Sequence, residues 1–154
     1  MGLFSFFKKL IFWESASDDD IEKTEISFAA DEEEIAGLNF KTAIEAHSQW
    51  KVRLSVYLRG GRNEELKVEN IEVDNKCVLG KWIYGEGGEK YGSELDEIKK
   101  VHAHFHKEAG LVLSTYLNGD KDKATALLND GDYSKYSANI KRMLMQLYIK
   151  LKDK

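Results

Sequence analysis

Residues 95–116 read LDEIKKVHAHFHKEAGLVLSTY and contain two histidines, His102 and His106, that lie four positions apart. Apolar residues recur here every three or four positions, which is the spacing of one face of an α-helix. The stripe consists of Leu95, Ile98, His102, Phe105, Ala109, Val112, Leu113 and Tyr116. Because four residues make slightly more than one turn, the two imidazoles leave the same face and can converge on one point.

Two further amphipathic helices are predicted on either side of this one. The first begins after Asn39, an N-cap residue, and ends at Gly60 and Gly61. Its apolar stripe is Phe40, Ala43, Ile44, His47, Trp50, Leu54, Tyr57 and Leu58. The last helix carries Ile140, Met143, Leu144, Leu147, Tyr148 and Leu151 at the same spacing. His47 therefore lies on a stripe that is expected to be buried.

Shorter pieces are expected to connect these helices. Residues 62–73 are charged and partly alternating, which is compatible with a strand, an extended connection or an irregular helix. Residues 74–84 indicate a short helical turn, and the glycine-rich stretch at 85–92 indicates a loop.

Helix starts and stops are marked by polar residues. Ser93 and Asp96 have the spacing of a capping box, which predicts the start of the central helix, and Asn118-Gly119 predicts its end. Asp122 is expected to cap a brief helix that ends near Asn129.

The composition describes one helix-rich globular domain. The chain has 154 residues, of which 42% are hydrophobic and 32% charged, with no proline and a net charge of −4. We predict an all-α fold, an antiparallel four-helix bundle with short extra helices at 36–154 and a loose N-terminal extension at 1–35. The mixed, slightly acidic charge argues against a nucleic-acid partner.

The extension combines an apolar segment at 1–13 with an acidic linker at 14–34. The apolar segment is too short for a membrane span, which needs about 20 residues. We expect it to dock on the bundle or on a partner; the alternative is peripheral membrane contact through its aromatic residues and two lysines. A single cysteine forms no internal disulfide, so we expect a reducing, cytoplasmic setting.

Three histidines and the only cysteine are candidate metal ligands. Zinc prefers four nitrogen or sulfur ligands in a tetrahedron, and His47, Cys77, His102 and His106 form such a set. The alternative is that the histidines are ordinary core residues with hydrogen-bond partners. His104 lies two residues from each histidine of the pair, so it points about 200° around the helix and should face solvent.

The order of these residues resembles a known family. His47-x-x-Trp50, Cys77-x-Leu79-Gly80-x-Trp82 and His102-x-x-x-His106 are similar to the three-part motif of the chemoreceptor zinc-binding (CZB) domain. The resemblance covers about residues 36–150 and implies that the four candidates are the zinc ligands in a four-helix bundle. It also implies that both tryptophans pack around the site and that Gly80 allows a close backbone approach near the metal.

The resemblance carries expectations about function. Four protein ligands leave no position for an activating water, so the chain is not expected to be an enzyme; a three-histidine site with water remains the alternative if Cys77 does not bind. The family occurs in bacterial chemoreceptors and diguanylate cyclases and responds to zinc or hypochlorous acid. The resemblance therefore implies a sensory role that acts through a homodimer or through a signalling partner of these classes. The rival reading is a module that zinc merely holds together.

Overall fold

The computed structural model of the protein describes residues 34–61 and 65–153. The regular elements of these residues are helices, joined by turns and irregular segments, and the prediction of an all-α bundle is confirmed. The helices are α3 (Phe40–Leu58), α4 (Val68–Ile71), α5 (Val78–Ile83), α6 (Glu86–Tyr91), α7 (Asp96–Leu117), α8 (Lys121–Asp130) and α9 (Asp132–Leu151), with a 3₁₀ turn, η1 (Gly92–Leu95), before α7.

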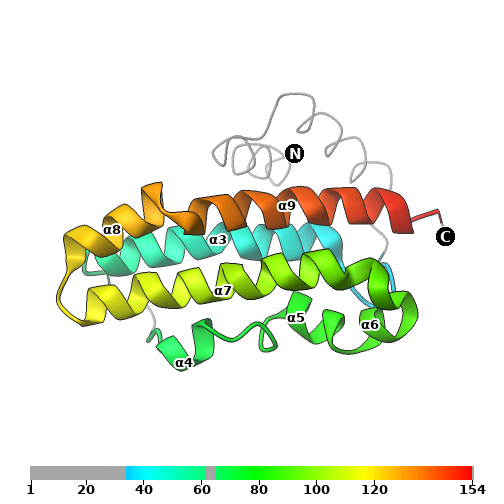
Figure 1. Ribbon diagram of the computed structural model, residues 1–154, viewed down its shortest axis with the longest axis horizontal. Coiled ribbons are helices and arrows are strands. Elements are labelled where there is room, and N and C mark those ends of the chain that lie inside the picture. Colours follow the sequence, from blue (N-terminus) through cyan, green and yellow to red (C-terminus); the bar gives the residue numbers. More distant parts are fainter. Residues whose placement is uncertain (1–33, 62–64, 154) are drawn as a thin grey trace.

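The chain runs four times along the long axis of the bundle (Figure 1). Helices α3 and α7 point in one direction, and the rows α4–α6 and α8–α9 return in the other. Consecutive rows are thus antiparallel. Two rows are single long helices, whereas the second row is built from three short helices, and the fourth is interrupted at Gly131 between α8 and α9.

The long helices bury the stripes that the periodicity predicts. The side chain of Asn39 accepts a hydrogen bond of 3.0 Å from the Thr42 amide and caps α3 as expected. Gly60 then leaves the helix with a φ of +89°, a conformation that glycine adopts readily. In the centre of the bundle, Phe105 of α7 packs against Tyr133 of α9 with 5.3 Å between ring centroids, and both side chains are fully buried.

The prediction of a loop at residues 85–92 is wrong, because most of this stretch forms α6. Its glycines serve close packing. A Cβ on Gly87 would collide with the ring of Trp82, and a Cβ on Gly88 would collide with the carbonyl of Ile83. Only residues without a side chain let α6 fold back so tightly on α5.

The predicted caps of α7 and α8 also need correction. Ser93 lies inside the 3₁₀ turn, and α7 follows Leu95 without a side-chain cap. The cap of α8 is Asp120, whose carboxylate accepts a 3.0 Å hydrogen bond from the Lys123 amide, so Asp122 lies in the first turn instead. The open question at 62–73 is settled for its described part, where the four-residue helix α4 is flanked by irregular chain.

The predicted apolar segment at 1–13 and nearly all of the acidic linker at 14–34 lie outside the described residues. At the start of the described chain, the backbones of Ile35 and Leu38 pair across a tight turn, and Leu38 is buried. No helix in the described ranges has both the length and the apolar character that crossing a membrane requires.

Candidate metal centre

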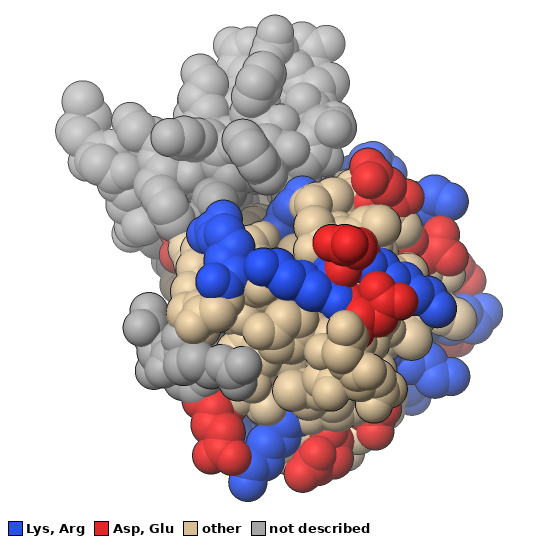
Figure 2. All heavy atoms as spheres, turned by 90° about the vertical axis from the view of Figure 1, so that its left-hand side faces the viewer, with Lys and Arg blue, Asp and Glu red and all other residues tan. Residues whose placement is uncertain are grey.

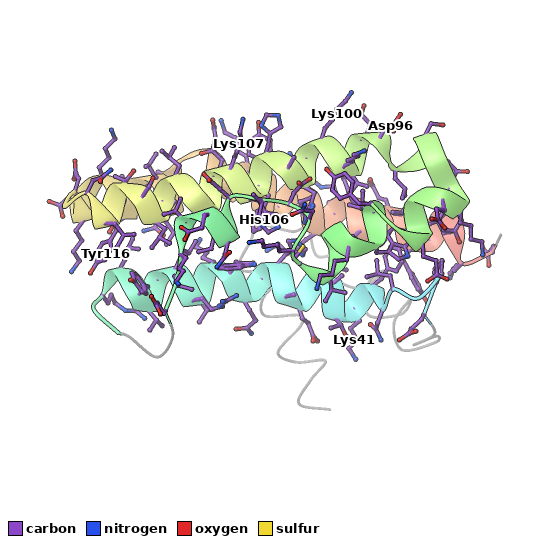
Figure 3. All side chains as sticks on the ribbon, turned by 90° about the horizontal axis from the view of Figure 1, so that it is seen from below. Lys41, Asp96, Lys100, His106, Lys107 and Tyr116 are labelled. Carbon is purple, nitrogen blue, oxygen red and sulfur yellow. The ribbon has the colours of Figure 1, made fainter. Side chains whose placement is uncertain are left out.

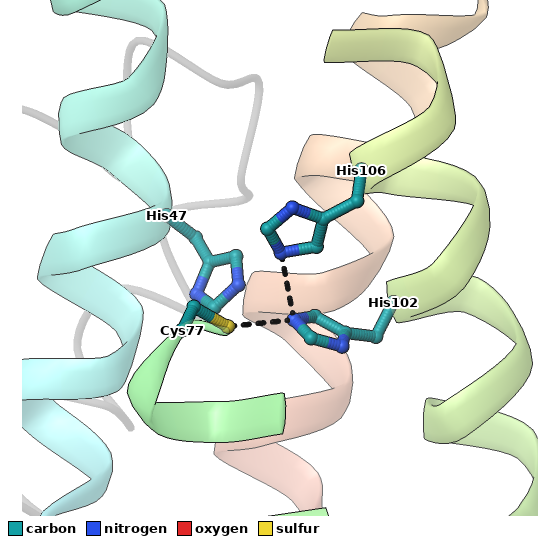
Figure 4. Close-up of side chains that lie close together, drawn as sticks. All are labelled: His47, Cys77, His102 and His106. Carbon is teal, nitrogen blue, oxygen red and sulfur yellow. Dashed lines mark hydrogen bonds between the residues drawn. The ribbon is translucent and has the colours of Figure 1, made fainter. Parts of the chain in front are cut away.

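The structure brings all four predicted ligands together. His47 projects from the middle of α3, His102 and His106 project from α7, and Cys77 comes from the residue before α5 (Figure 4). One potential ligand atom from each lies within 4.8 Å of the others. Figure 3 shows His106 directed from α7 into the bundle, whereas Lys100 and Lys107 lie on the opposite side of this helix. The four-residue spacing of the pair therefore does place both imidazoles on the inner face.

The separations fit a tetrahedral zinc ion. The Cys77 Sγ is 3.2 Å from the His102 Nε2, and the Nε2 atoms of His102 and His106 are 3.1 Å apart. With Zn–N bonds of about 2.0–2.1 Å and a Zn–S bond of about 2.3 Å, neighbouring ligand atoms of a tetrahedron lie roughly 3.3–3.6 Å apart. Small side-chain adjustments bring these donors to that spacing.

Hydrogen bonds orient two of the three imidazoles. The Nδ1 of His47 donates to the Ala43 carbonyl at 2.7 Å, and the Nδ1 of His106 donates to the Ile71 carbonyl at 2.8 Å. A proton held on Nδ1 leaves the lone pair of Nε2 for a metal, which is the usual arrangement of zinc-binding histidines. The Nε2 of His47 is buried without a hydrogen-bond partner in the described chain. An orphaned acceptor of this kind is costly unless a metal occupies the space.

Burial keeps the imidazoles in the form that binds metal. Removal from water lowers the pKa of His47 to about 4 and that of His102 to about 2, and it also lowers the pKa of His106. The buried cation of Lys141 on α9 adds to the effect on His47. Burial raises the pKa of the Cys77 thiol, so metal binding must release its proton.

A comparison with known families agrees with this geometry. Residues 47–113 match the family model of the chemoreceptor zinc-binding domain (CZB), and the match includes all four clustered residues. Residues 47–113 are therefore similar to a CZB domain. Zinc is therefore the metal that suits the cluster. No curated protein and no solved structure matches the chain.

Cys77 enters the CZB site from the start of a short helix. Its Sγ accepts a hydrogen bond of 3.3 Å from the Gly80 amide, so the thiol also caps α5. A Cβ on Gly80 would overlap the carbonyl oxygen of Asp74. The expected close approach at Gly80 is thus confirmed, and it holds the turn that presents the sulfur.

The two tryptophans of the CZB motif each make contacts outside the set of four ligands. Trp82 donates from Nε1 to the Ala36 carbonyl at 2.9 Å and packs edge-on against Phe40, with 5.7 Å between centroids. Trp50 is half-buried, and the Arg53 guanidinium lies 3.8 Å from the centre of its ring. Trp82 thus ties α5, the helix behind Cys77, to the start of α3, and packing of both tryptophans around the site stays a prediction.

His104 is exposed and stacks on Tyr136 of α9, with 5.0 Å between ring centroids, so its predicted orientation away from the site is confirmed. Three features near the ligands escape sequence reasoning. The carbonyls of Ala43 and Ile71 are backbone groups, which leave no signature in residue type. The burial of Lys141 does have a signature in the sequence, because Lys141 lies at helical spacing from Leu144 and Tyr148 on the buried stripe of α9.

Proposed function

We propose that His47, Cys77, His102 and His106 hold one zinc ion in a closed site whose role is sensory and not catalytic. Four protein ligands complete a tetrahedron and leave no position for a water or a substrate. The three imidazoles come from the long helices α3 and α7, whereas the Cys77 sulfur comes from the start of the short helix α5. Loss of the bond between Cys77 and zinc therefore affects mainly the position of α5. A three-histidine catalytic site requires Cys77 to stay unbound, which the 3.2 Å contact to His102 disfavours.

The observation that supports a sensory role is the unequal burial of the four ligand residues. The side chains of His47, His102 and His106 are 2%, 0% and 2% exposed, whereas Cys77 is only half-buried. The cysteine also lies between two exposed neighbours, Lys76 and Val78. A small oxidant can therefore reach the sulfur before it reaches any imidazole.

The proposed reaction is oxidation of the Cys77 thiolate by hypochlorous acid. The sulfur attacks the chlorine of HOCl and gives up two electrons, which forms a sulfenyl chloride and releases hydroxide. Water then displaces chloride from the sulfur, so the net change is thiolate plus HOCl to sulfenic acid plus chloride. In the first step the O–Cl bond breaks and an S–Cl bond forms; in the second the S–Cl bond breaks and an S–O bond forms, and the proton that the water loses neutralises the hydroxide. A sulfenic acid is a poorer zinc ligand than a thiolate. The start of α5 is then released from α7.

The released segment supplies the signal in this proposal. Zinc shortage acts on the same bond, because an empty site also frees Cys77 from the histidines. We extend the proposal to the receiver: a second copy of the chain in a homodimer, or a signalling protein of the chemoreceptor or diguanylate cyclase class. Support for these partners comes from the family resemblance alone.

The test follows the Zn–S bond during oxidation. X-ray absorption at the zinc edge is recorded on the zinc-loaded protein during a hypochlorite titration, and mass spectrometry measures oxidation of Cys77 in the same samples. We expect the sulfur contribution to fall in step with sulfenic acid formation. The matched control is His104→Ala, which alters an exposed histidine outside the site and should respond as the wild type does. Coordination that stays unchanged while Cys77 oxidises rules out the switch.

The second candidate function is a binding module that zinc only staples together. It is favoured by the small size of α4 and α5, which have four and six residues and gain support from a metal. Zinc removal separates the two candidates. If chelation lowers the melting temperature but leaves self-association in sedimentation velocity and partner binding unchanged, the stapling role holds and the sensory role does not.

A further inference from the structure

A cavity of about 400 Å³ lies between α3 and α8. Its size falls in the range of small-molecule sites, about 300–1,000 Å³. The apolar part of its wall comes from Val52, Leu58 and Leu128. Val52 is 45% exposed, which is unusual for a large aliphatic side chain in the middle of a packed helix.

The charged side chains that the described part of the chain contributes to this cavity are all basic. Lys51, Arg59 and Lys121 line it, and none of the lining residues within 34–61 and 65–153 is acidic, although the whole chain has a net charge of −4. Figure 2 views this end of the bundle and shows basic side chains in a band across the face, with acidic side chains beside part of it. Cations from two helices that meet over an apolar wall favour a ligand with a negative charge.

A buried hydroxyl lies in the same wall. Ser48 is 3% exposed, and its Oγ has no hydrogen-bond partner within the described chain. Buried polar atoms without a partner are uncommon and costly, so an unfilled hydrogen bond beside a cavity points to a ligand. Two other hydroxyls line the cavity, on Ser55 and Thr125, and that of Thr125 donates to the Lys121 carbonyl at 2.8 Å.

We propose that this cavity binds a small organic anion with an apolar body, of the medium-chain carboxylate class. The anionic group lies between Arg59 and Lys121, and the chain covers Val52, Leu58 and Leu128. This site is independent of the zinc ligands, although Ser48 directly follows His47 on α3.

The test titrates octanoate into the full-length, zinc-loaded protein, with calorimetry for affinity and amide NMR shifts for location. Two matched compounds separate the parts of the ligand: 1-octanol has the chain without the charge, and acetate has the charge without the chain. We expect saturable binding of octanoate only, with shifts at α3 and α8. Binding of octanol with equal affinity, binding of acetate with equal affinity, or no saturation with octanoate each overturns the proposal.

Substitutions test which side chains bind octanoate. Arg59→Gln and Lys121→Gln should each weaken octanoate binding about tenfold, the effect of one charge-assisted hydrogen bond. Ser48→Ala should weaken binding without lowering the melting temperature, because it removes a hydroxyl that has no partner to lose. Arg142→Gln is the control, since Arg142 is exposed on α9 and bonds to Asn139. Wild-type affinity in all three cavity variants contradicts the assignment, and zinc content is measured in each to show that the CZB site is intact.

Discussion

The long helices and the row of short helices contribute to the metal centre in different ways. Helices α3 and α7 have 19 and 22 residues and present three imidazoles from buried stripes that packing against α9 holds in place. The sulfur comes from the residue that caps a helix of six residues, and this helix is held by the Trp82–Ala36 hydrogen bond and the Gly80–Asp74 contact. The difference suggests a division of roles, in which the long helices fix the site and the short row can respond to its state.

The largest loss of stability is expected when a ligand leaves a long helix. His102→Ala removes one donor and leaves a cavity at a side chain that is 0% exposed. Zinc affinity should fall by more than about 100-fold, beyond the effect of losing an outer hydrogen-bond partner. The free energy of unfolding of the zinc-loaded protein should fall by several kcal/mol, on the order of a large-to-small core change plus lost metal binding. Chelator competition and urea unfolding measure both; His104→Ala should change neither.

Low pH should destabilise the protein through His47, His102 and His106. Burial holds the pKa of His47 at about 4 and that of His102 at about 2, below the ordinary 6.5. Below pH 6.5 the unfolded chain therefore binds more protons than the folded chain. The contribution of these neutral histidines to the free energy of unfolding is fully present above pH 6.5 and is lost as the pH falls toward 4. In that window each buried histidine costs about 1 kcal/mol per pH unit. Urea unfolding of the zinc-free protein between pH 7.5 and pH 4.5 measures this loss, and a flat profile would contradict the burial of neutral imidazoles.

A change in the short row should have a smaller and more local effect. In Gly80→Ala the new methyl group collides with the Asp74 carbonyl, which should destabilise the protein by about 1–3 kcal/mol, the usual cost of overpacking. Hydrogen exchange should increase mainly in α5, with α7 and α9 still protected. Val78→Ala is the control in the same helix, because Val78 is 62% exposed. Uniform loss of protection in every helix would remove the distinction between the two regions.

The smallest effect on the fold is expected at the sulfur itself. Without zinc, Cys77→Ala removes the acceptor for the Gly80 amide and the 3.2 Å contact of the sulfur with the His102 Nε2, which should cost about 1 kcal/mol, the scale of other N-caps. With zinc, the same variant should lose affinity on the scale of His102→Ala. Unfolding and chelator competition on both metal states test this contrast. If the zinc-free variant is destabilised as much as His102→Ala, the short row does not depend on the metal in the way described.

The sequence predicts the long helices better than the short row for a physical reason. The stripes of α3, α7 and α9 repeat over five turns or so, and each repeat adds information about the buried face. The short helices depend on single contacts between segments. Glycine is needed at position 87 because a Cβ there would collide with the ring of Trp82, and the spacing of apolar residues in the sequence does not show this contact. For the same reason the glycine-rich stretch at 85–92 reads as a loop, and Asp122 is mistaken for the cap that Asp120 provides.

The candidate site was predictable as a set of residues but not as an environment. His47, Cys77, His102 and His106 carry side chains that few other roles require together, so their order along the chain is informative. The acceptors that orient the histidines are the carbonyls of Ala43 and Ile71, and any residue can supply a carbonyl. The unequal burial of the cysteine and the histidines likewise depends on packing between rows that are distant in sequence.

X-ray absorption at the zinc edge of the purified, zinc-loaded protein tests the central claim most directly. We expect one zinc ion per chain with three nitrogen neighbours at about 2.0–2.1 Å and one sulfur neighbour at about 2.3 Å. Cys77→Ala should remove only the sulfur neighbour. A wild-type spectrum with nitrogen and oxygen neighbours alone, or a purified protein that takes up no zinc, would contradict the site.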